Sequence, residues 1–108
     1  MNAKVEQRNA ALVKANVYRI AVAEKRREIA AMDRIEAAFY LADLIETADD
    51  PGLLSGRITH YLTSIPGRGP TYSNRVLGEL GVRVATKRLR DLTDRQRRIL
   101  ADEIRRQK

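Results

Sequence analysis

The sequence predicts an all-α protein in which a long N-terminal helix precedes a compact helical domain. Residues 2–32 contain no glycine or proline, and alanine, arginine, lysine and glutamate dominate there, which favours one uninterrupted helix. Beyond residue 50, apolar residues recur at helical spacing between glycine and proline breaks. A chain of 108 residues that is 44% apolar can bury one modest core. We therefore expect an extension over residues 1–33 and a single helical domain over residues 34–108.

The first helix carries only a thin apolar stripe. Val13, Val17 and Ile20 share one face, and charged side chains interrupt the rest of the surface, so the first half of this helix is predicted to project from the domain. Asp33 and Glu36 have the spacing of a capping box, which favours a helix start after residue 33. No glycine or proline marks a turn there, so the break between the first two helices stays open.

The following elements are read from apolar runs and turn residues. Residues 37–45 form the most apolar stretch and are predicted to be a core helix, and the acidic Pro-Gly stretch 49–52 is a loop. A helix is expected over 57–64, and the Pro-Gly hairpin 66–70 ends it. A second helix is expected over residues 71–80.

The C-terminal part is expected to end in one amphipathic helix. Gly81 is placed to cap the preceding helix in a left-handed conformation, and residues 82–91 are predicted to form a longer turn. Thr93 and Gln96 have capping-box spacing, so the last helix should run over 93–106. The apolar residues expected to be buried here are Leu92, Ile99, Leu100 and Ile104.

Charge and composition point to a polyanionic partner. The 21 Lys and Arg residues exceed the 14 Asp and Glu residues, which gives a formal net charge of +7 and an isoelectric point near 10.2. Residues 37–56 carry four acidic and no basic side chains, so the basic charge lies toward the two ends. The chain has no cysteine and no apolar run long enough for a membrane span. We expect a soluble, intracellular protein.

The segment 64–70 is the strongest candidate for an anion site. Gly67 and Gly69 allow the backbone to bring its N–H groups close to an anion, and the basic side chains that follow suggest phosphate. An ordinary tight turn between helices, with no ligand, is the competing interpretation. The basic side chains that follow are Arg75, Lys87, Arg88 and Arg90.

The remaining basic and aromatic side chains have simpler explanations. We expect the arginines of the last helix, at 95, 97, 98, 105 and 106, to lie on its exposed face and pair with Asp94, Asp102 and Glu103. His60 is interpreted as a packing residue, because no second His or Cys could complete a metal site. Tyr40 and Tyr61 are interpreted as core residues, and Tyr72 could be core or could stack on a base.

Four segments together resemble a known family. They are residues 61–69 (YLTSIPGRG), 78–82 (GELGV), 87–92 (KRLRDL) and 93–97 (TDRQR). This succession resembles the actinobacterial integration host factor family, and residues 13–105 can be laid against its pattern. The resemblance implies a small, all-helical, nucleoid-associated DNA-binding protein with a helix-two-turns-helix module at about 57–106. The same module occurs in a small-subunit ribosomal protein and in DNA glycosylases.

The resemblance also implies which residues contact DNA. The basic triplet before the last helix would grip phosphates, the hairpin would present backbone amides, and the basic end of the first helix would make a second contact. The sequence departs from the family pattern in having 37–40 (AAFY) in place of a glycine loop, and Asp91 in place of a glycine, which would weaken one phosphate contact. The DNA-binding residues expected are Lys25, Arg26, Arg27, Arg34, Gly67, Arg68, Gly69, Thr71, Ser73, Arg75, Lys87, Arg88 and Arg90.

The expected function is binding without catalysis. One histidine, no cysteine and no inward-facing carboxylate pair leave no general base with a partner to orient it, and neither a cofactor nor a metal is expected. We expect a monomer that binds duplex DNA through phosphates with low sequence specificity and bends or bridges it. The resemblance adds an integrase or recombination complex as a partner, and a cytoplasmic, nucleoid-associated location. An RNA- or ribosome-associated protein and a protein-interaction module are the alternatives.

Overall fold

The computed structural model describes residues 3–78, 80–81 and 86–107, with side chains from residue 7 onward. Within these residues every regular element is helical, which confirms the all-α prediction, and an isolated bridge joins Arg57 to Arg88. The elements are α1 (Ala3–Ala30), α2 (Arg34–Thr47), α3 (Pro51–Leu54), α4 (Ile58–Leu62), α5 (Pro70–Leu77), the 3-10 turn η2 (Leu89–Asp91) and α6 (Asp94–Arg106).

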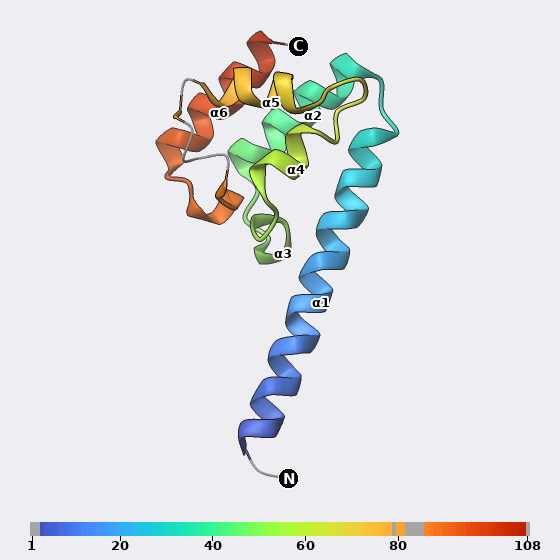
Figure 1. The fold of residues 1–108 in the computed structure, drawn as a ribbon, viewed down its shortest axis with the longest axis vertical. Coiled ribbons are helices and arrows are strands. Elements are labelled where there is room, and N and C mark those ends of the chain that lie inside the picture. Colours follow the sequence, from blue (N-terminus) through green and yellow to red (C-terminus); the bar gives the residue numbers. More distant parts are fainter. Residues whose placement is uncertain (1–2, 79, 82–85, 108) are drawn as a thin grey trace.

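The first half of α1 extends away from the helical domain (Figure 1). The apolar stripe predicted on α1 is exposed, with 63% of Val13, 55% of Val17 and 48% of Ile20 accessible to solvent. The second half is attached to the domain, because Ile29 is fully buried. Near its middle, α1 approaches α3 so closely that a Cβ on Gly52 would lie 3.2 Å from the Ala21 Cβ.

The break between α1 and α2 lies at residues 31–33. The Met32 N–H donates to the Ile29 carbonyl at 3.2 Å, and the Asp33 carboxylate accepts from the Glu36 N–H at 3.0 Å. The Asp33 cap therefore starts α2 without a glycine. The residues that replace the family's glycine loop do not extend the break, since Ala37 and Ala38 are buried within α2.

The core lies mainly between α2 and α6, which pack against each other. Leu41 and Ile45 of α2 are buried with Leu100 and Ile104 of α6. Arg97 also joins the two helices, since it donates to the carbonyls of Ile45 at 2.6 Å and Ala48 at 2.5 Å. The expectation that Arg97 is a solvent-facing, ion-paired residue is therefore wrong, because this guanidinium satisfies carbonyls at the C-terminal end of α2.

The other predicted elements differ from the structure mainly at their ends. Helices α4 and α5 are shorter than expected, and α5 is capped by Gly78 rather than by Gly81. Gly81 does adopt the predicted left-handed conformation, with φ +91°, and its N–H donates to the Leu77 carbonyl at 3.0 Å. Residues 82–85 of the predicted turn lie outside the described residues. The Thr93–Gln96 capping box is confirmed at 3.0 and 3.1 Å, whereas Ile99 is half-buried, not buried.

Candidate nucleic-acid interface

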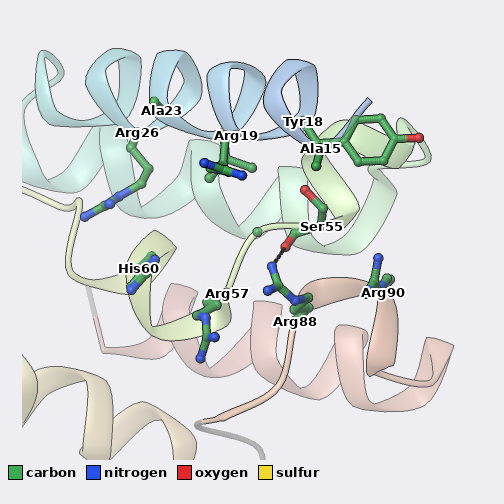
Figure 2. Close-up of a pocket in the computed structure, with 12 residues that line it drawn as sticks. Ala15, Tyr18, Arg19, Ala23, Arg26, Ser55, Arg57, His60, Arg88 and Arg90 are labelled. Carbon is green, nitrogen blue, oxygen red and sulfur yellow. Dashed lines mark hydrogen bonds between the residues drawn. The ribbon is translucent and has the colours of Figure 1, made fainter. Parts of the chain in front are cut away.

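A cleft of about 530 Å³ lies between α1 and the segments around α4 and η2. Figure 2 shows its two walls, one from α1 and the other from residues 55–60 together with Arg88 and Arg90. Its lining residues are Ala15, Tyr18, Arg19, Val22, Ala23, Arg26, Ser55, Gly56, Arg57, His60, Arg88 and Arg90.

The residues of the first wall lie on one face of α1. Ala15, Arg19, Val22 and Arg26 follow one another at intervals of four, three and four residues, so they share one face of α1. This face turns toward the domain, whereas the exposed stripe of Val13, Val17 and Ile20 lies on another face. Two arginines one heptad apart therefore face the second wall across the cleft.

Backbone hydrogen bonds hold the two segments of the second wall together. The Ile58 N–H donates to the Lys87 carbonyl at 3.2 Å, and the Leu89 N–H donates to the Gly56 carbonyl at 2.9 Å. These two bonds flank the bridge between Arg57 and Arg88. The basic segment before α6 is thus held beside the start of α4, and both contribute arginines to the same cleft.

Arg88 has a structural role as well as a charge. Its guanidinium donates to the Ser55 carbonyl at 2.6 Å (Figure 2), and its N–H donates to the Asp91 carboxylate at 3.0 Å. Arg88, which the resemblance assigns to a phosphate contact, is therefore also bonded within the fold. Asp91, expected to weaken a phosphate contact, caps η2 through this backbone bond.

Arg26 connects the cleft to the end of α4. Its Nε donates to the Ser64 hydroxyl at 3.0 Å, and that hydroxyl donates to the His60 carbonyl at 2.7 Å. One guanidinium edge is therefore fixed by the fold. Because the α4–α5 hairpin begins just after Ser64, Arg26 lies at the end of the cleft from which the chain leads into the hairpin.

The cleft carries a strong positive potential. Five of its lining residues are arginines, and none of the described residues that line it is acidic. The pKa of His60 lies below the ordinary value of 6.5 because of partial burial and then the nearby Arg26, Arg57 and Arg88. His60 is exposed in this wall, so it is not the packing residue expected from the sequence.

Three basic residues predicted at the end of α1 and the start of α2 do not line this cleft. Lys25 donates to the Tyr40 hydroxyl at 2.7 Å and to Glu28 at 2.9 Å, and these bonds raise its pKa. Its charge is therefore neutralised within the fold, and Tyr40 is half-buried beside it. Arg27 and Arg34 are exposed.

The hairpin forms a second, smaller basic surface. Gly67 has φ +76°, which a side chain would strain. The Arg68 N–H already donates to the Ile65 carbonyl at 3.1 Å, so the hairpin does not offer all three of its amides. The Arg68 guanidinium lies 4.6 Å from the centre of the Tyr72 ring and donates to the Gln107 carbonyl at 3.2 Å. This positions its charge at the surface beside α6.

The predicted residues that follow the hairpin divide by burial. Thr71 and Arg75 are exposed on α5. Ser73 is only 3% exposed and its hydroxyl has no partner, so it does not reach the surface as a DNA contact requires. Tyr72 is also buried, which leaves its ring unable to stack on a base.

The structure brings together only some of the predicted residues. Arg26, Arg88 and Arg90 line the cleft, whereas Lys87 is half-buried and contributes its carbonyl to the second wall. Two arginines that line the cleft, Arg19 and Arg57, were not among the predicted site residues. The spacing of Arg19 from Arg26 could have revealed the first, but Arg57 enters through a pairing with distant Arg88, for which the sequence carries no local signature.

No protein-family model, no curated protein and no solved structure matched this chain. No described helix combines the length and apolar character needed to cross a membrane. Among the described residues, no three His, Cys, Asp or Glu side chains are grouped as a metal site would require.

Proposed function

We propose that this protein is a non-enzymatic binder of duplex DNA that holds the phosphate backbone in the cleft between α1 and the helical domain. The observation that carries the proposal is the convergence of five arginines on one cleft whose described lining contains no carboxylate. Guanidinium groups at a concave surface without carboxylate partners attract phosphate and bind it through charge-assisted hydrogen bonds. The hairpin around Arg68 offers a second phosphate contact beside α6.

Low sequence specificity follows from the kind of contact proposed. The lining consists of five arginines, small residues, Val22, His60 and Tyr18, and contacts to phosphates fix the position of a protein on DNA without reading its bases. The molecule measures 53 Å along its longest axis, and α1 extends much of that length (Figure 1). A duplex with one strand's phosphates in the cleft could therefore meet both α1 and the domain, which supports bending or bridging of DNA.

The resemblance to actinobacterial integration host factors supports a more specific proposal. In that proposal the protein is nucleoid-associated, acts in the cytoplasm as a monomer and assists an integrase or another recombination complex. The cleft supports the DNA-binding part, because the basic triplet on which the resemblance depends contributes Arg88 and Arg90 to it. The recombination partner follows from the resemblance alone.

Two variants of equal net charge test the proposal. Arg19→Gln with Arg90→Gln removes two exposed cleft charges, and Arg95→Gln with Arg98→Gln removes two exposed charges of α6 outside the cleft. The cleft variant should bind duplex DNA roughly tenfold or more weakly than the α6 variant. Equal losses in both variants would reject the cleft as the DNA site, and tighter binding of a matched RNA duplex would favour the RNA-associated alternative.

A further inference from the structure

The cleft is small for a double helix but has the dimensions of a small-molecule site. Its volume of about 530 Å³ falls in the range of ligand pockets. The B-DNA duplex presents its phosphates singly along two strands, so only a short stretch of one strand could enter. Arginines from both walls line this one volume, and they are better matched by a ligand that concentrates several negative charges on adjacent phosphates.

The two ends of the cleft differ chemically. His60 and Arg26 lie at one end, Arg19 and Arg88 lie between, and Tyr18 lies near Arg90 at the other end (Figure 2). Tyr18 is half-buried against α3, near Gly52, and it is the aromatic residue among the described lining residues. A flat ring at the end of an arginine-rich cleft suits a ligand with a base at one end and phosphates at the other.

We propose that the cleft binds a free nucleoside polyphosphate, with the phosphates among Arg19, Arg26 and Arg88 and the base against Tyr18. Such a ligand would occupy the same guanidinium groups as DNA and displace it. The inference shares its site with the proposed function, because a nucleotide that competes with DNA would regulate DNA binding. Nucleotide binding itself does not require DNA binding, so the two can be measured separately.

His60 provides a direct readout, because it is the only histidine in the chain. Its imidazole proton resonances are therefore unambiguous in an NMR spectrum of the full chain. Partial burial, and then the nearby Arg26, Arg57 and Arg88, lower its pKa, and bound phosphates would oppose the effect of the arginines. We expect the midpoint of its NMR pH titration to rise when ATP is added without Mg²⁺. An unchanged midpoint at millimolar ATP would overturn the proposal.

Matched variants locate the ligand and identify its two parts. Arg19→Gln should weaken ATP binding about tenfold in calorimetry, whereas Arg98→Gln, which removes the same charge outside the cleft, should leave it unchanged. Equal weakening would mean that ATP binds through net charge alone, and the proposal would fail. Tyr18→Leu should weaken the binding of ATP but not that of inorganic tripolyphosphate. Equal effects on the two affinities would reject the proposal that the base lies against Tyr18.

Competition separates this inference from the proposed function. If both are correct, ATP displaces a labelled DNA duplex, and adenosine at the same concentration does not. ATP binding by a protein that fails to bind DNA would reject the proposed function and keep the nucleotide site. The His60 shift gives the ATP concentration at which the nucleotide site is saturated. If DNA binding is unchanged at that concentration, the two ligands use different surfaces, and the proposal that ATP competes with DNA is rejected.

Discussion

Arg88 combines two roles that the sequence could not separate. As a member of a basic triplet it is predicted to grip phosphate, but its guanidinium also holds the Ser55 carbonyl at 2.6 Å. Arg90, two residues later, is exposed on the same wall of the cleft. The difference arises because the pairing of residues 56–58 with 87–89 turns one arginine toward a carbonyl and leaves the other to solvent.

This difference can be measured by single substitutions. Arg88→Ala should lower the free energy of unfolding by about 1.5 kcal/mol, because it leaves a partly buried carbonyl without its charged donor. Arg90→Ala should change it by no more than about 0.5 kcal/mol. Urea unfolding followed by circular dichroism compares the two. Equal stability of both variants would mean that the Ser55 bond contributes nothing to the fold.

Gly56 is required for a packing reason. A Cβ at this position would lie 2.5 Å from the Tyr61 hydroxyl oxygen and 2.6 Å from two ring carbons. Tyr61 cannot move away easily, because it is fully buried and donates to the Leu53 carbonyl at 2.6 Å. The same burial raises the pKa of Tyr61 to about 12. The glycine thus lets the cleft wall pass directly over a core tyrosine.

We therefore predict that Gly56→Ala lowers the free energy of unfolding by about 2 kcal/mol or more, because the added methyl group overpacks the site. Gly69→Ala is the control, since no atom lies within 4 Å of a Cβ built there, and its cost should stay below about 1 kcal/mol. Both values come from urea unfolding. A Gly56→Ala variant as stable as Gly69→Ala would show that Tyr61 moves aside at no cost.

At the scale of elements, local patterns predicted most of the fold. The long helix, the left-handed Gly81 and the Thr93–Gln96 capping box each depend on residues close in sequence, so they could be predicted directly. The spacing of Asp33 and Glu36 favoured the start of α2 but left the break before it open. The cleft could not, because it depends on a bridge between residues 57 and 88 and on the face with which α1 meets α3.

The same locality explains the errors in the predicted site. Ser73 was included because it follows the hairpin, but its position on α5 turns it into the core. Lys25 was included for its charge, but it is ion-paired with Glu28 on α1 and donates to the Tyr40 hydroxyl on α2. A basic residue contributes to a site only when tertiary packing leaves its charge unpaired, and that packing is not visible in a local motif.

Truncation of α1 tests how the extended helix is held. Deleting residues 1–14 removes the exposed residues 7–14, which precede the contact of Tyr18 and Ala21 with α3, so the free energy of unfolding should change by less than about 0.5 kcal/mol. Deleting residues 1–24 also removes that contact and should cost about 1–2 kcal/mol, with a cooperative transition retained. Thermal unfolding compares the two proteins, and an equal loss in both would mean that the exposed half of α1 stabilises the domain.

At the scale of the whole molecule, the net charge of +7 makes some attraction to DNA expected wherever the charges lie. The distinctive feature is the concentration of guanidinium groups in one cleft. If its five arginines each neutralise one phosphate, the slope of log binding constant against log salt should be about −4.5. Affinity should then fall several hundredfold between about 50 and 200 mM salt.

The charge-matched variants show how many phosphate contacts the cleft contributes to this slope. Replacing Arg19 and Arg90 by Gln should make the slope less steep by about 1.8, and replacing Arg95 and Arg98 should leave it unchanged. Fluorescence anisotropy with a labelled duplex at several salt concentrations measures both slopes. A slope that changes equally in the two variants would assign the salt dependence to total charge and not to the cleft.

The central claim is that DNA phosphates enter the cleft between α1 and the helical domain. The most direct measurement is a map of amide NMR shifts as a short duplex is titrated into the ¹⁵N-labelled full chain. The largest shifts should fall on residues 15–26, 55–60 and 87–90, which form the two walls, with smaller shifts at the hairpin. Shifts confined to α6 or to the first turns of α1, with the cleft residues unchanged, would contradict the claim.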